Sequence, residues 1–375
     1  MKRVLLVSNG AGEDAIATRV ATHFEGLQAE ALPLVGLGQA YQGGCSVVGP
    51  LRRFASEGLV RESAGNFLAD LRQGLLAHHL RQWRFLRSCR GRYSAVIAVG
   101  DLFPVVMAAL AGLRPLIFVG TAKSVWHHAY SRPELWLLRW FTSASLTRDE
   151  PTAEQLRAAG LRAAWVGNAM MDELATTDLE LPLAGLPGLA IFPGSREATY
   201  TDFPRLLASY QALVESGCQV QALVALASSI DAERLAATCP AWSYRPEGER
   251  LVGRLERSGF PPVLFCRGAL GDMLAHCQVA LGQAGTANEQ AAGAGLPVVA
   301  AAEGGEANLG WYRGRQKGLL GEALKVVEPE GVVSELRTLF QEPDERQRRG
   351  EIGRQRMGPP GGALRMARAI ERLVE

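Results

Sequence analysis

The length and composition of the chain indicate a soluble globular protein of two domains. Its 375 residues exceed the usual size of one domain, and 47% of them are hydrophobic and 21% are charged. A formal net charge of +2 excludes the strongly basic class of nucleic-acid-binding proteins. The six cysteines form no Cys-x-x-Cys pair and no cluster with metal-ligand spacing, so we expect reduced thiols, no bound metal and a cytoplasmic location. No apolar run reaches the roughly 20 residues of a membrane-spanning helix.

The first half of the chain alternates between strand and helix patterns. A strand, a Gly-rich turn, a helix and a second strand are predicted at Val4–Ser8, Gly10–Asp14, Ala15–Phe24 and Ala29–Val35. This alternation predicts a parallel sheet covered by helices on both faces. The turn fits a loose dinucleotide-binding pattern, but Glu13 and Asp14 would repel a pyrophosphate. We therefore interpret it as a ligand-binding turn at the carboxyl end of a strand.

A basic helical segment follows. Apolar residues recur at helical spacing over Asn66–Leu86, and Leu71–Tyr93 contains six arginines, Arg81 and Arg84 among them, and no acid. One interpretation is a surface for an anionic membrane or an anionic acceptor, and the other is an ordinary solvated helix face.

Asp101 is the first candidate catalytic residue. The predicted strand Ser94–Val99 leads into Gly100 and Asp101, at the strand end where open α/β sheets place their ligands. An N-cap of the next helix is the alternative role for this Asp. The loop Ser124–His128 and the segment Leu135–Phe141 then bring three tryptophans into fifteen residues, which suits either core packing or a lipid-contacting surface.

The second half repeats the plan and contains two phosphate-type turns. Strand Leu189–Phe192 ends in Pro193-Gly194-Ser195-Arg196, and strand Val279–Gly282 precedes a second Gly-rich turn that opens a helix. Backbone N–H groups at such turns bind anions, and a guanidinium can hold two phosphate oxygens at once. The candidate residues for binding the phosphates and ribose of a nucleotide are Gly194, Ser195, Arg196, Gly285, Thr286, Ala287, Asn288 and Glu289. Glu289 is expected to accept hydrogen bonds from ribose hydroxyls.

These patterns define the expected domain boundaries. We expect a Rossmann-like domain over residues 1–177, a linker over 178–188, a second Rossmann-like domain over 189–352, and a helical segment over 353–375 that packs back on the first domain.

The motifs resemble those of lipid-A-disaccharide synthase, a glycosyltransferase with the GT-B fold. The matching segments run in order along nearly the whole chain: Gly12-Glu13-Asp14, Gly100-Asp101, Ser124-Val125-Trp126, Val166-Gly167 with Asp172, Pro193-Gly194-Ser195-Arg196, Gly285-Thr286-Ala287 with Glu289, and Leu296-Pro297-Val298-Val299. The second half also resembles the transferase that makes the lipid-linked disaccharide of peptidoglycan. The chain departs from the synthase pattern in two places. Asp101 is followed by Leu-Phe-Pro-Val-Val instead of a motif with a second Asp and an Asn, and Lys317-Gly318-Leu319-Leu320 replaces Pro-Asn-Leu-Leu.

The resemblance implies an inverting glycosyltransferase with two Rossmann-like parallel-sheet domains. It implies a UDP-sugar donor bound by the second domain, and a lipid-linked or sugar-phosphate acceptor bound by the first. Asp101 would be the general base and Glu13 the second choice, and Gly12, Ser124, Trp126, Arg81 and Arg84 would contact the acceptor. No Asp-x-Asp metal-binding motif occurs in the sequence, and we expect no cofactor. Two alternatives stay open: a UDP-sugar epimerase of the same fold, and a non-catalytic protein that binds a nucleotide sugar or a glycolipid.

Overall fold

The computed structural model describes residues 1–375 except 53–72, 178, 184 and 306–308. The described chain divides into two compact units: unit 1 is Met1–Asp172 with Pro360–Glu375, and unit 2 is Glu173–Pro359. These boundaries differ from the expected ones. Residues 173–177 belong with unit 2, where Asp272 accepts hydrogen bonds from the backbone and side chain of Thr177. The C-terminal segment of unit 1 begins at Pro360 and not at residue 353, because the helix before it packs within unit 2.

Unit 1 is built on a parallel sheet. Among the described residues the sheet has seven strands in the order β3-β2-β1-β4-β5-β6-β7, and every neighbouring pair is parallel. The strands are β1 (Lys2–Ser8), β2 (Leu27–Pro33), β3 (Ser46–Val47), β4 (Ala95–Gly100), β5 (Leu116–Gly120), β6 (Ala144–Thr147) and β7 (Ala163–Trp165). The helices are α1 (Ala11–Ala21), α3 (Leu75–Ser88), α4 (Leu102–Leu110), α5 (Arg132–Phe141), α6 (Glu150–Ala158) and α14 (Gly362–Val374).

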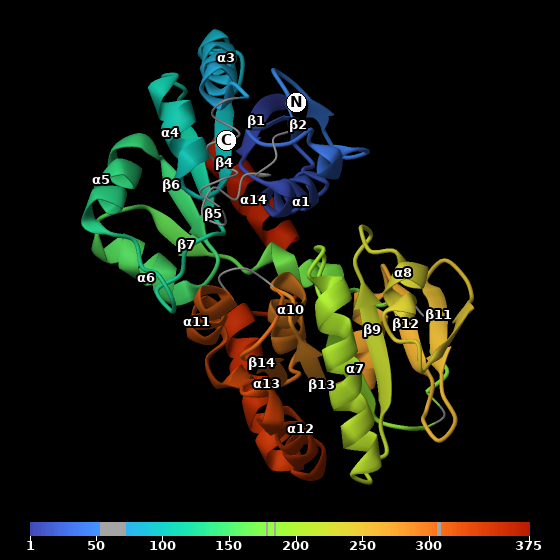
Figure 1. Ribbon diagram of the computed structural model, residues 1–375. Helices are drawn as coiled ribbons and strands as arrows, with labels where there is room; N and C mark the ends of the chain where they lie inside the picture. The colour runs from blue at the N-terminus through green and yellow to red at the C-terminus, as the bar shows by residue number, and fades with distance from the viewer. Residues whose placement is uncertain (53–72, 178, 184, 306–308) are drawn as a thin grey trace. The chain divides into compact units, whose positions relative to one another are not determined.

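Strand β1 shows why the sheet of unit 1 is covered on both faces. Val4 and Leu6 pack into the core under α1 and α14, whereas Leu5 and Val7 pack into a second core under α3, α4 and α5. Successive side chains of a strand point to opposite faces, so a run of apolar residues needs a helical layer on each side. The C-terminal helix α14 supplies part of one layer and lies beside α1 (Figure 1).

Asp172 anchors the return of the chain to unit 1. Its carboxylate accepts hydrogen bonds from the backbone N–H groups of Gly361, Gly362 and Ala363, at the start of α14. A carboxylate at this position satisfies otherwise unpaired donors and interacts favourably with the positive end of the helix. The Asp of the Val-Gly-x-x-x-x-Asp motif therefore has a structural role in this chain.

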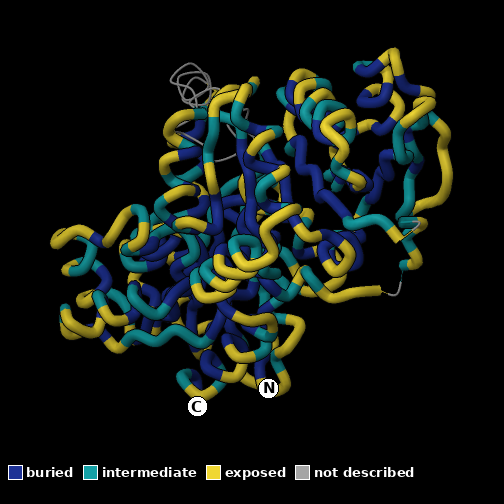
Figure 2. The backbone as a smooth tube through the Cα atoms, turned by 90° about the horizontal axis from the view of Figure 1, so that it is seen from below, coloured by how far each residue is buried: buried dark blue, intermediate teal, exposed yellow. Residues whose placement is uncertain are grey.

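Unit 2 contains a mixed sheet. Among the described residues it has eight strands in the order β10-β11-β12-β9-β8-β13-β14-β15. The pairs β10–β11 and β11–β12 are antiparallel, and the other neighbouring pairs are parallel. The strands are β8 (Gly188–Phe192), β9 (Gln221–Leu226), β10 (Ser243–Pro246), β11 (Leu251–Glu256), β12 (Val263–Arg267), β13 (Cys277–Gly282), β14 (Val298–Ala301) and β15 (Leu324–Val327). The helices are α7 (Thr199–Glu215), α8 (Ala232–Ala237), α9 (Leu270–His276), α10 (Thr286–Ala294), α11 (Leu309–Leu320), α12 (Val332–Gln341) and α13 (Pro343–Met357). In both units the central strands are buried (Figure 2).

Helix α13 packs tightly against α10. A Cβ atom on Gly350 would lie 2.1 Å from the carbonyl oxygen of Gly295, and one on Gly353 would lie 2.2 Å from that of Ala292. Both positions therefore need glycine. This backbone contact holds α10, the helix that follows the second phosphate-type turn.

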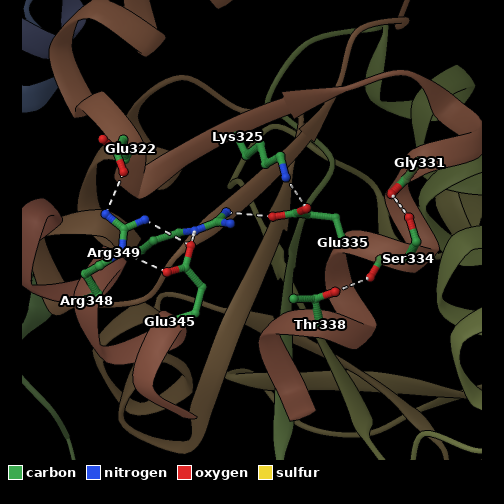
Figure 3. A network of polar contacts seen from close by, with 9 residues as sticks. All are labelled: Glu322, Lys325, Gly331, Ser334, Glu335, Thr338, Glu345, Arg348 and Arg349. Atoms are coloured by element: carbon green, nitrogen blue, oxygen red, sulfur yellow. Dashed lines mark hydrogen bonds and ion pairs between the residues drawn. The ribbon is translucent and has the colours of Figure 1, made fainter. Parts of the chain in front are cut away.

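A polar network joins α13 to its other neighbours (Figure 3). Arg349 is 8% exposed, and its guanidinium contacts Glu335 on α12 and Glu345 on α13, each at 2.6 Å. Glu335 also accepts from Lys325 on β15, and the exposed Arg348 bridges Glu322 and Glu345. Hydrogen bonds from Arg348 and Arg349 hold the pKa of Glu345 at about 2, so this carboxylate is ionised at neutral pH.

No helix among the described residues combines the length and the hydrophobicity that crossing a membrane requires. In the same part of the chain, no group of three or more His, Cys, Asp or Glu side chains is arranged to hold a metal ion.

The buried Arg349 network predicts a difference between two adjacent arginines. Arg349→Met should lower the free energy of unfolding of unit 2 by about 1.5–3 kcal/mol, because the buried Glu335 loses one of its two cationic donors and keeps only Lys325. The matched change Arg348→Met should cost less than about 1 kcal/mol, because Arg348 is an exposed ion-pair member. Urea unfolding followed by circular dichroism measures both. Equal losses in the two variants would contradict this view of the network.

Candidate functional site

The two phosphate-type turns of unit 2 follow neighbouring strands. β8 and β13 pair in parallel, with Phe192 opposite Gly282, so the loops after both strands leave the same edge of the sheet. The backbone N–H of Gln283 donates to the carbonyl of Phe192 at 2.8 Å and joins the two loop starts. Ligands of open α/β sheets bind at this edge.

The first turn presents Ser195 and Arg196 to solvent. Both residues are exposed, and Gly194 before them has a φ of 118°, which favours glycine. The turn is tied back to α7, because the backbone N–H of Thr199 donates to the carbonyl of Arg196 at 3.0 Å. The helix begins at Thr199, so Arg196 lies just ahead of its first turn.

The second turn presents the start of α10. Gly285 is the N-cap residue and makes no side-chain hydrogen bond, since glycine has none to offer. Gly285 and Thr286 are exposed, and Ala287 is half-buried. The first N–H groups of a helix have no partner within the helix, so an uncapped, exposed N-terminus can bind an anion.

The other two candidates on α10 are buried. Asn288 is fully buried and its Nδ2 donates to the carbonyl of Gly282 at 3.3 Å. A Cβ on Gly282 would lie 1.9 Å from Asn288 Oδ1, so this glycine makes room for the amide. Glu289 is 9% exposed. Asn288 supports the turn from within, and only a small part of Glu289 is exposed.

The sequence pattern did not predict two residues that lie near this edge. Arg313 and Gln316 lie one turn apart on α11 and are each 5% exposed. Gln316 donates to the carbonyls of Ala284 and Gly285, in the second turn itself. The only sequence signal for these two residues is a charged side chain and an amide side chain three residues apart. This spacing is not distinctive, because the same helix carries other charged residues.

In unit 1 the candidate acids Glu13 and Asp101 follow neighbouring strands. β1 and β4 pair in parallel; Glu13 lies in the first turn of α1, which follows β1, and Asp101 directly follows β4. The Glu13 side chain lies against both loops: a Cβ on Gly100 would be 2.7 Å from its Cγ, and a Cβ on Gly10 would be 2.6 Å from its Oε2. Both glycines have positive φ values, of 120° and 149°. The structure thus brings the two predicted catalytic acids to one edge of the sheet.

Asp101 has two hydrogen-bonded neighbours and remains exposed. Its Oδ1 accepts from the backbone N–H of Phe103 at 2.9 Å, which makes Asp101 the N-cap of α4. Asn9 Nδ2 lies 3.2 Å from each of its carboxylate oxygens. Both roles considered from the sequence, the cap and the strand-end carboxylate, are compatible in this arrangement.

Asp14 lies behind Glu13 in a buried polar cluster. Asp14 is 3% exposed; Ser8 Oγ donates to its Oδ1 at 2.5 Å, and Tyr41 Oη lies 2.6 Å from the same Ser8 oxygen. The pKa of Asp14 is raised to about 7, chiefly by burial. The hydrogen bond from Ser8 lowers this pKa, and the charge of Glu13 raises it.

The remaining acceptor candidates are divided between loops and a helix face. Gly12 is exposed in the first turn of α1. Ser124 is fully buried and its Oγ accepts from the backbone N–H of Trp126 at 3.1 Å, so it shapes the loop and is not open to an acceptor. Trp126 is 38% exposed. Arg81 and Arg84 are exposed on α3, which covers a face of the sheet and not its edge.

Arginines and apolar side chains share the outer surface of the helices α3, α4 and α5. These helices cover one face of the unit 1 sheet, and α4 contacts both of the others. The exposed apolar residues on them are Leu76, Leu80, Leu110, Trp136 and Trp140. The rings of Trp136 and Trp140 lie 5.9 Å apart. The first part of the predicted basic segment, up to residue 72, lies outside the described residues.

The buried Asp14 predicts a pH-dependent stability. Its pKa is higher in the folded state than the value of about 3.9 in an unfolded chain, so between about pH 4 and pH 7 the folded state holds a proton that the unfolded state has released. The contribution to the free energy of unfolding is present below pH 4 and is lost as the pH rises toward 7, by about 4 kcal/mol at most. Asp14→Asn should therefore gain stability relative to the wild type over this range in urea titrations. Parallel pH profiles of the two proteins would contradict it.

Comparison with known proteins supports the fold. No protein-family model matches the chain, and neither does any curated protein. Solved structures do match. One is a UDP-GlcNAc 2-epimerase of Neisseria meningitidis bound to UDP-GlcNAc (TM-score 0.59, 12% identity, 99% of each chain covered), and another is MnaA of S. aureus with UDP (TM-score 0.63, 11% identity, 100% of this chain and 97% of that chain covered). A third is the glycosyltransferase SnogD of Streptomyces nogalater (TM-score 0.54, 16% identity, 100% of each chain covered). The chain thus has the GT-B-type fold of two α/β units, with a parallel sheet in unit 1 and a mainly parallel sheet in unit 2.

Proposed function

We propose that this protein is an inverting glycosyltransferase that moves a sugar from a UDP-sugar to a lipid-linked or sugar-phosphate acceptor. The observation that carries the proposal is the pair of turns in unit 2. An exposed arginine turn and an uncapped helix N-terminus follow adjacent parallel strands, β8 and β13. This arrangement suits a diphosphate, which presents several anionic oxygens over a short distance.

The donor site would act by stabilising the leaving group. As the bond between the anomeric carbon and the diphosphate oxygen breaks, negative charge builds on the UDP. The Arg196 guanidinium and the N–H groups at the start of α10 would bind that charge. The absence of an Asp-x-Asp motif from the sequence favours this metal-independent form of catalysis.

Asp101 is the proposed general base of unit 1. It would take the proton of the acceptor hydroxyl while that oxygen attacks the anomeric carbon, and the bonding electrons of the old glycosidic bond would leave with UDP. A carboxylate held by Asn9 and by the start of α4 keeps its orientation without protein movement. Glu13 lies close enough to the same loops to be the competing candidate.

The similar solved structures support a UDP-sugar as the ligand more strongly than they support glycosyl transfer as the reaction. Those that match the chain include transferases and UDP-GlcNAc 2-epimerases, so the epimerase alternative is a direct competitor. The motif resemblance to lipid-A-disaccharide synthase supports transfer, with an acylated glucosamine as one candidate sugar. An epimerase would convert its UDP-sugar without an acceptor, whereas a transferase needs one.

The outer surface of α3, α4 and α5 supports a lipid-linked acceptor. Exposed leucines and tryptophans lie there beside Arg81, Arg84 and Arg87, and α3 contains no acid. Tryptophan rings favour the interface between lipid headgroups and acyl chains, and arginines are attracted to anionic headgroups. We propose that unit 1 contacts an anionic membrane surface through these helices.

The proposed base predicts a selective loss of turnover. Asp101→Asn should lower the release of UDP in the presence of acceptor by at least about a hundredfold, while UDP affinity stays within about twofold, because it removes basicity and preserves the N-cap. Asp231→Asn is the matched control, since Asp231 caps α8 in the same way, through the Arg234 N–H, in unit 2. Coupled detection of UDP and calorimetry with UDP give the two readings.

The same assay separates the alternatives. Loss of turnover in Glu13→Gln but not in Asp101→Asn would exchange the two roles. Conversion of the UDP-sugar without an acceptor would establish the epimerase, and UDP-sugar binding with neither reaction would leave a binding protein.

The membrane surface predicts a salt-dependent interaction. The triple change of Arg81, Arg84 and Arg87 to Gln should reduce co-sedimentation with anionic liposomes, and salt should reduce that of the wild type, because the attraction is electrostatic. A triple change of the exposed arginines Arg245, Arg257 and Arg337 to Gln in unit 2 alters the net charge equally and should have little effect. Equal sedimentation with neutral liposomes, or none with either kind, would leave the arginines as an ordinary solvated face.

A further inference from the structure

Two buried side chains of α11 connect the end of β14 to the turn before α10. Arg313 Nε donates to the carbonyl of Ala301, the last residue of β14, at 3.2 Å, and its Nη1 donates to Gln316 Oε1 at 3.0 Å. Gln316 Nε2 donates in turn to the carbonyls of Ala284 at 3.0 Å and Gly285 at 3.1 Å. The turn is thus held from one side by a two-residue relay, Arg313 to Gln316.

The relay controls the direction of the N–H groups in the turn. A trans peptide plane points its C=O and its N–H in opposite directions, and the carbonyl of Ala284 shares a plane with the N–H of Gly285. The carbonyl of Gly285 shares a plane with the N–H of Thr286 in the same way. Because Gln316 draws both carbonyls toward α11, the two N–H groups are directed away from that helix. They are the donors that a bound anion at the start of α10 would use.

Arg313 adds a buried charge that the described residues compensate only in part. Its Nη2 is buried and has no hydrogen-bond partner among them, and none of their carboxylates lies within ion-pair distance of the guanidinium. Burial lowers the pKa of Arg313 to about 10, and the charge of the buried Asp202 opposes this shift. The guanidinium therefore stays protonated at neutral pH. A buried cation without a close counter-ion is costly, and an anion bound nearby reduces that cost.

We propose that Arg313 and Gln316 are positioning residues for the donor diphosphate: Gln316 fixes the Ala284–Gly285 turn with its N–H groups presented, and Arg313 holds Gln316 and contributes positive potential behind the turn. This inference rests on the proposed function and assigns the residues that prepare its phosphate site. Neither side chain needs to touch the ligand.

The test compares UDP with uridine, which lacks the phosphates. Gln316→Leu and Arg313→Met should each weaken UDP binding by about tenfold or more in calorimetry, and should change uridine binding by less than about twofold. A role in general stability would weaken both ligands in parallel, and would overturn the proposal. Arg315→Met is the matched control on the same helix, because Arg315 is only half-buried and lies over the Trp311 ring at 5.9 Å. It should leave both affinities unchanged.

Two further measurements cover the remaining outcomes. Arg313→Lys keeps the charge and should retain more UDP affinity than Arg313→Met, and it replaces that variant if the latter does not fold. If the wild type binds no UDP, the proposed function fails. Inorganic pyrophosphate then tests the turn alone: binding to the wild type with a tenfold loss in Gln316→Leu would support the positioning role. A wild type that binds neither ligand, or variants that bind UDP as well as the wild type does, would overturn it.

Discussion

Parallel strands with both faces buried leave little room for polar chemistry except at the ends of the strands. In unit 1, alternate residues of β1 enter two separate cores, so neither face of that strand can present a polar group to a substrate. The same holds for β8, whose five residues are all buried. Polar residues are therefore collected in the loops at the carboxyl ends, and pairing in register brings loops that are distant in sequence to one place. Phe192 opposite Gly282, and Ser8 opposite Val99, are the pairs that assemble the two candidate edges.

Glycines make these edges compact enough to act as sites. Gly10 and Gly100 leave space for Glu13 between two loops, and Gly282 leaves space for Asn288 behind the second turn of unit 2. In each case a methyl group would overlap a polar side chain. These glycines are therefore needed for close approach, and two of them also have positive φ values that other residues seldom adopt.

Rigid support is a common feature of both edges. Asp101 is held by the start of α4 and by Asn9, and the Gly285 turn is held by Gln316. Helix α10 is fixed from its other side by the glycine contacts of α13, which the Arg349 network ties to α12. Pre-organised groups of this kind favour electrostatic catalysis, because little reorganisation is needed when charge develops. The buried Asp14 cluster behind Glu13 gives the first turn of α1 a comparable internal anchor.

The sequence by itself determined the fold class and the loops that contain the candidate site residues. Apolar runs such as Val4–Val7 and Leu189–Phe192 are continuous because both faces of the strand are buried, and Gly-rich turns must follow them. These signals are local, so Arg196, Gly285, Glu13 and Asp101 could be chosen from the sequence. Helix starts were less accurate: the first helix begins at Ala11 and not at Ala15, because the residues of the Gly-rich turn form its first turn and the Asp14 N–H donates to the Gly10 carbonyl.

Only the tertiary structure decided which of these residues are accessible and what holds them. Ser124 belongs to a motif of the resembled family and Asn288 is a candidate donor-binding residue, yet both are buried and their side chains bond to nearby backbone groups. Gln316 reaches the turn from a helix some thirty residues later, and Arg313 holds Gln316 in place; no local sequence pattern encodes these contacts. The boundaries of the two units differ from the expected ones for the same reason. Asp172 and Asp272 accept hydrogen bonds from segments about a hundred or more residues away in the sequence. Such contacts depend on the packing of the fold and not on the composition of a linker.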